Sequence, residues 1–219
     1  MDQALDSRAG CFLPVCSYSN PLRSRVGATH AVDLLASRFS KVAIVVADEL
    51  QRINIQLRGS SAADALKNST IAGANTTRMY HSVIRGNGLA NVEVIEMSKL
   101  RRSAEFQGAE ARLLTAIYSV ERFRKETERF VSRASRRFGW HDSVGARQLE
   151  MEYLNLEIVT SVFMSELAGY PFEIWEDLPP ASDPDPLTVA YTSAASEISE
   201  ALGKQVLGRR LLALASLEG

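Results

Sequence analysis

The spacing of apolar positions predicts three strands within the first hundred residues. Residues 11–16 form a short apolar run that predicts a first strand, bulged or one-sided at Pro14, which cannot donate to a ladder. Residues 41–47 form an apolar run rich in valine and isoleucine, which is typical of a strand buried on both faces. Residues 91–97 alternate between apolar and polar positions and predict a third strand. A helix predicted at 29–39, with Thr29 as its N-cap, separates the first two strands. Strand, helix and strand in this order predict a parallel pair joined by a right-handed crossover.

The remainder of the chain is mostly helical in pattern. Helices are predicted at 61–85, at 104–137 with a break near Gly108, and at 144–167. A proline-rich loop at 179–186 then precedes a predicted strand at 187–191 and a last helix at 194–214. We therefore expect an α/β fold: a single Rossmann-like domain spanning residues 1–219, with a parallel sheet flanked by helices on both faces.

Ligands of such sheets bind beyond the carboxyl ends of the strands. On the elements predicted above, the segments at this edge are residues 17–20, 48–52 and 191–193. These segments are the expected location of a functional site.

Composition and the pattern of charges indicate the cellular compartment and the kinds of partner that we expect for the protein. Its two cysteines, Cys11 and Cys16, lie on opposite faces of one predicted strand and are badly placed to pair, which fits a reducing compartment. We expect a cytoplasmic protein without a membrane anchor, because the sequence has neither a signal-peptide pattern nor an apolar run of about 18 residues. Residues 99–137 contain eleven Lys/Arg and five Asp/Glu, whereas residues 150–200 contain eleven Asp/Glu and no Lys/Arg. This asymmetry predicts two surfaces with different partners.

Four segments, in order and with similar spacing, resemble the cyclodipeptide synthases. The first is the apolar strand that leads into Ser17 and Asn20; the others are residues 39–59, 153–158 and 189–191. The resemblance spans roughly residues 11–202, with 60–140 matched only in outline. It implies a fold similar to the catalytic domains of class I aminoacyl-tRNA synthetases, without their ATP machinery and with no cofactor.

The sequence also departs from the family pattern. Cys11 stands where the family usually has histidine, and Val15 stands where it usually has glycine. Val159 stands where proline is common, and Thr192 stands where histidine or proline is common. These differences suggest a divergent branch, such as the fungal arginine-containing cyclodipeptide synthases.

The resemblance implies diketopiperazine synthesis from two aminoacyl-tRNAs. Ser17 would attack an aminoacyl ester and hold the aminoacyl group covalently, in a ping-pong scheme that passes through a dipeptidyl-enzyme. Glu157 would hold and deprotonate the α-amine, and Tyr153, one helical turn away, would share in anchoring that amine. Tyr191 would relay a proton during cyclisation, and Asn20 would orient the aminoacyl group.

Two cationic segments are candidates for the tRNA interface, and the sequence does not choose between them. One lies on the helix predicted at 61–85 and the other within the basic stretch 122–137; their candidate residues are Lys67, Arg78 and Arg85, and Arg122, Arg124, Lys125, Arg129 and Arg133. Whether the protein is a monomer or a homodimer is also left open.

Each of these features has a structural alternative. A serine after a strand is more often a turn residue than a nucleophile, and Tyr and Glu four residues apart occur on many helices. Glutamates interleave the 122–137 stretch, so a salt-bridged helix face is an equal interpretation there. The three histidines have neither metal-ligand nor triad spacing, and no metal site is expected.

Two other functions compete with the synthase. The main alternative is a non-catalytic Rossmann-like module that binds tRNA, which would need the basic residues but not the candidate catalytic ones. A serine hydrolase is disfavoured, because the Gly-x-Ser-x-Gly elbow and a suitably placed His–Asp pair are absent from the sequence. The sequence does not identify the two amino acids joined. If acidic residues such as Glu150, Glu166, Glu173 or Asp177 lined the pocket, a cationic side chain such as arginine would be favoured.

Overall fold

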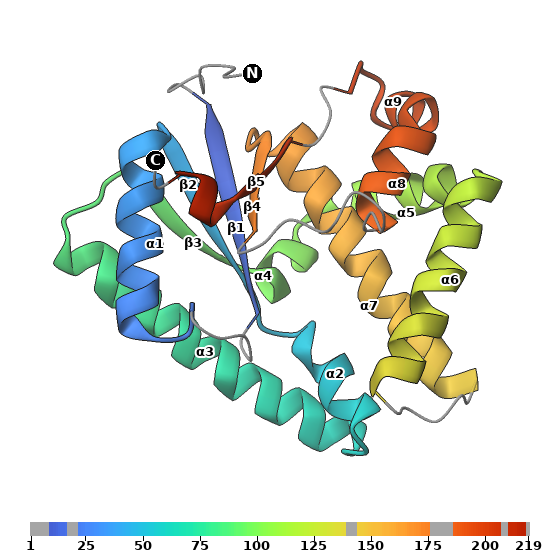
Figure 1. The fold of residues 1–219 in the computed structure, drawn as a ribbon, viewed down its shortest axis with the longest axis horizontal. Helices are drawn as coiled ribbons and strands as arrows, with labels where there is room; N and C mark the ends of the chain where they lie inside the picture. The colour runs from blue at the N-terminus through green and yellow to red at the C-terminus, as the bar shows by residue number, and fades with distance from the viewer. Residues whose placement is uncertain (1–8, 17–21, 139–143, 176–185, 207–209, 218–219) are drawn as a thin grey trace.

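A five-stranded parallel sheet, in the order β3-β2-β1-β4-β5, organises the structure (Figure 1). The computed structural model describes residues 9–16, 22–138, 144–175, 186–206 and 210–217, with only the backbone described for 134–138 and 144. The strands, in chain order, are β1 Gly10–Cys16, β2 Lys41–Ala47, β3 Val92–Glu96, β4 Phe172–Trp175 and β5 Arg210–Ala213. All paired neighbours are parallel.

Helices cover both faces of this sheet. On one face, α1 (Arg25–Arg38) and α3 (Ala62–Gly86) pack against alternate side chains of β1 and β2. On the other face lie α5 (Ala104–Tyr118) and α7 (Val144–Val162), with α6 (Glu121–Phe138), α8 (Pro186–Ser193) and α9 (Ala195–Leu202) outside them (Figure 1). Two short helices, α2 (Gln51–Leu57) and α4 (Met97–Arg102), follow β2 and β3, a π-helical turn follows α7 at Phe163–Leu167, and a 3₁₀ turn follows β5 at Leu214–Leu217.

The central strand β1 faces two different environments. Cys11, Leu13 and Val15 are buried in the α1–α3 core, and Phe12 is buried in the core on the α7 side. Pro14, on the same face as Phe12, is exposed although its strand lies between two others. The α7 side of the sheet is therefore open near the carboxyl end of β1.

A glycine permits close packing at the carboxyl end of β2. Gly73, in the middle of α3, is buried, and a Cβ built there would lie 2.2 Å from the Cβ of Asp48. No larger residue fits without displacing either α3 or the turn that follows β2. Although glycine weakens a helix, α3 continues through this position.

The structure corrects the predicted C-terminal third. Residues 187–191, predicted to form the last strand, belong to α8, and the predicted helix 194–214 ends at Leu202 and gives way to β5. Pro186 is the first residue of α8, where its missing N–H costs no hydrogen bond, and Leu187, Ala190 and Tyr191 are buried with helical spacing. The fourth strand is β4, which the sequence prediction missed; its residues Phe172–Trp175 favour a strand but are too few for their periodicity to identify one.

Most of the remaining elements follow the sequence pattern. Helix α1, however, begins at Arg25 and not at residue 29, because Ser24 and not the predicted Thr29 is its N-cap and accepts a 3.0 Å hydrogen bond from the backbone N–H of Gly27. Strands β1, β2 and β3 lie where they are predicted, and the fold class is confirmed. The break in the predicted 104–137 helix falls at residues 119–120, between α5 and α6, and not at Gly108. None of the helices in the described part of the chain is long and apolar enough to cross a membrane.

Candidate active site

The carboxyl ends of β1 and β2 lie level with one another, because Cys16 pairs with Ala47 in the strand register. After β2, Asp48 accepts a hydrogen bond of 2.9 Å from the backbone N–H of Ser98 and another from its hydroxyl, at the first turn of α4. Glu49 forms ion pairs of 3.4 Å with Arg101 and Arg102. Asp48 and Glu49 therefore hold α4 in place, in agreement with the structural role that the sequence favours.

Tyr153 and Glu157 meet at this edge of the sheet. Tyr153, on α7, is half-buried, and its phenol hydrogen-bonds the carboxylate of Glu157 and the side chain of Asn54 on α2. Burial, and then the negative charge of Glu157, raise the pKa of Tyr153 well above its usual value; the thiol of Cys16 lies close enough to add to the shift. The phenol therefore stays protonated at neutral pH and serves as a hydrogen-bond donor, while Glu157 is exposed to solvent.

Helix α2 extends this hydrogen-bonded group. Asn54 donates a 3.2 Å hydrogen bond to the side chain of Gln51, which is 1% exposed. The Gln51 Nε2 group is buried and has no acceptor among the described residues. An ion pair between Arg52 and Glu152 joins α2 to α7 next to Tyr153. Neither Asn54 nor Gln51 belongs to a motif that would mark it as a site residue in the sequence; the only signal is their position just after the turn that follows β2.

Of the other candidate catalytic residues, the structure describes Tyr191 but not Ser17 or Asn20. Ser17 and Asn20 lie outside the described residues, although Cys16, which precedes Ser17, adjoins Tyr153. Tyr191 is on helix α8, not at the end of a strand, and is 8% exposed in the same core cluster as Leu154 and Ile158 of α7. Tyr153 and Glu157 are thus brought together, and the approach of Tyr191 to them stays a prediction.

Three of the four acidic candidates for a cationic pocket are buried. Glu150, Glu166 and Glu173 are each at most 6% exposed, and Asp177 lies outside the described residues. Glu173, on β4, accepts hydrogen bonds from the hydroxyl of Ser161 and, at 2.7 Å, from the indole N–H of Trp175. These contacts give Glu173 a structural role between β4 and α7.

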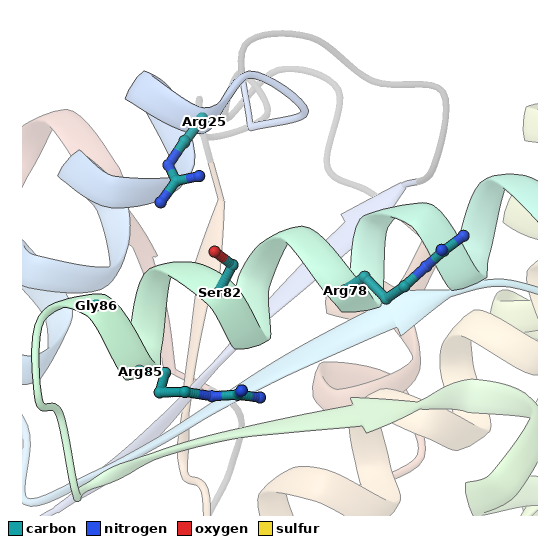
Figure 2. Close-up of a pocket in the computed structure, with 5 residues that line it drawn as sticks. All are labelled: Arg25, Arg78, Ser82, Arg85 and Gly86. Carbon is teal, nitrogen blue, oxygen red and sulfur yellow. The ribbon is translucent and has the colours of Figure 1, made fainter.

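The structure distinguishes the two cationic candidates for tRNA binding. On α3, Lys67, Arg78 and Arg85 share one exposed face of the helix, and Lys67 and Arg85 form no ion pair with any described residue. Arg78, Arg85 and Ser82 line a cavity of about 560 Å³ together with Arg25 of α1 (Figure 2). Figure 2 shows Arg25 reaching from α1 toward Ser82 on α3.

On α6, by contrast, part of the positive charge is neutralised within the helix. Lys125 pairs with Glu121 at 2.7 Å, and Arg129 pairs with Glu126 at 3.0 Å. The remaining candidates on this helix are Arg122, Arg124 and Arg133, of which Arg133 is half-buried. Ion pairs therefore involve at least two of the five candidates on α6, whereas none of the three candidates on α3 forms one with a described residue.

No group of His, Cys, Asp and Glu side chains in the described ranges is arranged to hold a metal ion. The arrangement at the sheet edge consists instead of a phenol, a carboxylate and side-chain amides. Such groups can bind an amine, exchange a proton with it and orient a carbonyl.

Comparison with known proteins finds likeness in three-dimensional structure but none in sequence. No family model matches the sequence, and no curated protein matches it either. Among solved structures, AlbC, a cyclodipeptide synthase from Streptomyces noursei, is similar over 96% of this chain and 98% of its own, with a TM-score of 0.71 and 14% identity. The fold is that of the cyclodipeptide synthases.

Two further structures support and extend this likeness. A cyclodipeptide synthase from Candidatus Glomeribacter gigasporarum, bound to Phe-tRNAPhe, has a TM-score of 0.50 at 12% identity over 94% of this chain and 87% of its own. A tyrosyl-tRNA synthetase from Aeropyrum pernix has a TM-score of 0.53 at 13% identity over 94% of this chain and 53% of its own. The expected likeness of the cyclodipeptide synthase fold to class I synthetases is confirmed.

Proposed function

We propose that this chain, as one domain, is a tRNA-dependent cyclodipeptide synthase that joins two aminoacyl groups through Ser17. The observation that carries the proposal is the Tyr153–Glu157 pair, which lies beside Cys16 at the end of the strand that leads into Ser17. The fold of the cyclodipeptide synthases supports it.

In the first step, Ser17 Oγ attacks the ester carbonyl of an aminoacyl-tRNA. The bond from the carbonyl carbon to the ribose oxygen breaks, and the tRNA leaves with a free hydroxyl that takes up the serine proton. The ester is already activated, so the step needs no ATP. The free enzyme becomes an aminoacyl-enzyme.

In the second step, the α-amine of the bound aminoacyl group attacks the ester of a second aminoacyl-tRNA and forms the peptide bond. The Glu157 carboxylate binds the ammonium form and accepts the proton that the amine must lose before it attacks. Tyr153 stays protonated because its pKa is raised, so it serves as a hydrogen-bond donor that fixes the carboxylate. A second tRNA leaves, and the product is a dipeptidyl-enzyme.

In the third step, the free amine of the dipeptide attacks the Ser17 ester, which closes the diketopiperazine ring and returns the serine hydroxyl. Tyr191 relays a proton in this step and Asn20 orients the acyl carbonyl. The exposed face of α3, with Lys67, Arg78 and Arg85, binds the tRNA backbone.

The proposal is tested by expressing the protein in a bacterial host and analysing the medium by mass spectrometry. We expect a diketopiperazine that is absent with the Ser17→Ala variant and still present with Ser37→Ala, which removes an exposed hydroxyl on α1. If purified protein binds tRNA but forms no cyclodipeptide with any of the twenty aminoacyl-tRNAs, the alternative of a non-catalytic tRNA-binding module replaces this proposal.

A further inference from the structure

A buried amide on α2 has a donor group without an acceptor. Gln51 is 1% exposed, and its Nε2 group has no hydrogen-bond acceptor in the part of the chain that the structure describes. Its neighbours Leu50 and Ile53 belong to an apolar cluster with Leu156 of α7. A buried donor that stays unpaired destabilises a fold, and an apolar side chain of similar length would avoid this cost. A glutamine at this position therefore needs a reason.

The oxygen of the same amide holds Asn54. Asn54 Nδ2 donates the 3.2 Å hydrogen bond to the oxygen of Gln51. Asn54 also hydrogen-bonds the phenol of Tyr153, which in turn hydrogen-bonds Glu157. These four side chains form one row of hydrogen bonds, which leads from a buried amide on α2 to an exposed carboxylate on α7.

The carboxylate sets the direction of this row. A phenol has a single proton, and a carboxylate accepts it more strongly than a neutral amide does. The proton of Tyr153 therefore goes to Glu157, and the phenol oxygen accepts a hydrogen bond from Asn54. Burial and Glu157 raise the pKa of Tyr153, whereas the hydrogen bond with Asn54 lowers it, as a donor to the phenol oxygen does.

The direction of the row also explains the unpaired donor. The amide nitrogen of Asn54 has two protons, one for Tyr153 and one for Gln51, so Gln51 must present its oxygen and leave Nε2 without an acceptor. Nε2 would find an acceptor in Asn54 only if both amides were turned around. The phenol would then donate to Asn54 and no longer to Glu157. The unpaired donor is thus the consequence of directing the phenol proton to the carboxylate.

We propose that Gln51 and Asn54 are positioning residues, which direct the proton of the Tyr153 phenol to Glu157 and so hold the carboxylate in place for the attacking amine. Both act through Tyr153. The proposal rests on the proposed function, because Glu157 serves there as the base in peptide-bond formation.

The test is Gln51→Met, which keeps the length of the side chain and removes both polar atoms of the amide. Asn54 is half-buried, so water can accept the proton that it no longer donates to Gln51. We expect the melting temperature to stay the same or rise, because the unpaired donor is gone. We expect the maximal rate of peptide-bond formation to fall about fivefold to tenfold, the order of one lost hydrogen bond.

The rate is measured by loading the protein with a radiolabelled aminoacyl group and then chasing the aminoacyl-enzyme with a second aminoacyl-tRNA. The yield of aminoacyl-enzyme and the half-saturating concentration of the second aminoacyl-tRNA are expected to stay unchanged. Gln56→Met is the matched control, because it is the same substitution at a half-buried position of α2 whose side chain accepts a 3.5 Å hydrogen bond from Arg52. It is expected to keep the wild-type rate.

A wild-type rate in Gln51→Met, or a loss of rate together with a lower melting temperature, overturns the positioning role and leaves the proposed function standing. If Gln51→Met does not fold, Asn54→Leu provides the second measurement at a half-buried position. It is expected to slow the chase by about tenfold at an unchanged yield of aminoacyl-enzyme, and an equal loss in both quantities overturns the role. A folded wild-type protein that forms no cyclodipeptide overturns the proposed function, and the positioning role with it.

Discussion

The phenol of Tyr153 donates a hydrogen bond to the carboxylate of Glu157, one turn further along α7. Because the phenol is buried next to a negative charge, its pKa lies well above the usual value and it stays protonated across the physiological range. In the proposed mechanism the two side chains therefore have different roles: the carboxylate accepts protons, and the phenol holds it in position.

Glu157→Gln is expected to lower the rate of cyclodipeptide formation by about 10² or more, because the amide cannot accept the proton of the attacking amine. Tyr153→Phe leaves the carboxylate in place and is expected to cost less. Initial rates with purified aminoacyl-tRNA measure both. A Glu157→Gln variant that retains wild-type rate would remove this carboxylate from the chemistry.

Gly73→Ala tests the packing of α3 against the turn after β2. An added Cβ would lie 2.2 Å from Asp48 Cβ, so we expect a loss of about 1–3 kcal/mol in the free energy of unfolding, as for other overpacked cores. Gly108→Ala is the matched control. Gly108 is exposed on α5 with no atom near the position of its Cβ, and alanine there is expected to stabilise by about 0.5–1 kcal/mol. Urea denaturation of both variants measures the difference.

The sequence predicts the N-terminal half of the sheet well because β1 and β2 are seven-residue strands and β3 alternates. It fails for β4 and β5, which are only four residues long each and are held mainly by neighbouring strands. The segment 187–191 is rich in strand-forming residues, but tertiary packing against α6 and α7 makes it helical.

The sequence predicts less of the candidate site than of the fold. Residues four apart on one helix must share a face, so the Tyr153–Glu157 contact follows from the sequence. The participation of Asn54 and Gln51 depends on how α2 lies against α7, which no local pattern encodes. On α6 the paired glutamates lie three or four residues from their partners, so the sequence already indicates these ion pairs, whereas the cavity that Arg25 and Arg85 share depends on how α1 lies against α3.

Tyr118 is expected to make the fold sensitive to alkaline pH. Burial against α7, where its hydroxyl hydrogen-bonds Asn155, raises the pKa of Tyr118 to about 12. An unfolded tyrosine titrates near about 10, so the folded state binds more protons between these values and stability falls as pH rises from about 10 to 12. Tyr118→Phe is expected to make this fall shallower, as measured by thermal unfolding across that pH range. An unchanged pH dependence would contradict the assignment.

The final prediction concerns the salt dependence of tRNA binding. Each cation that contacts a phosphate adds about one to the slope of log affinity against log salt. Lys67→Ala and Arg85→Ala remove cations that form no ion pair with described residues, so each is expected to weaken tRNA binding and lower the slope by about one. Lys125→Ala is the matched control, because its ammonium is paired with Glu121 at 2.7 Å and its removal is expected to change little. If the α6 variant reduced the slope and the α3 variants did not, the tRNA interface would lie on α6, and α3 would carry a positive surface with another purpose.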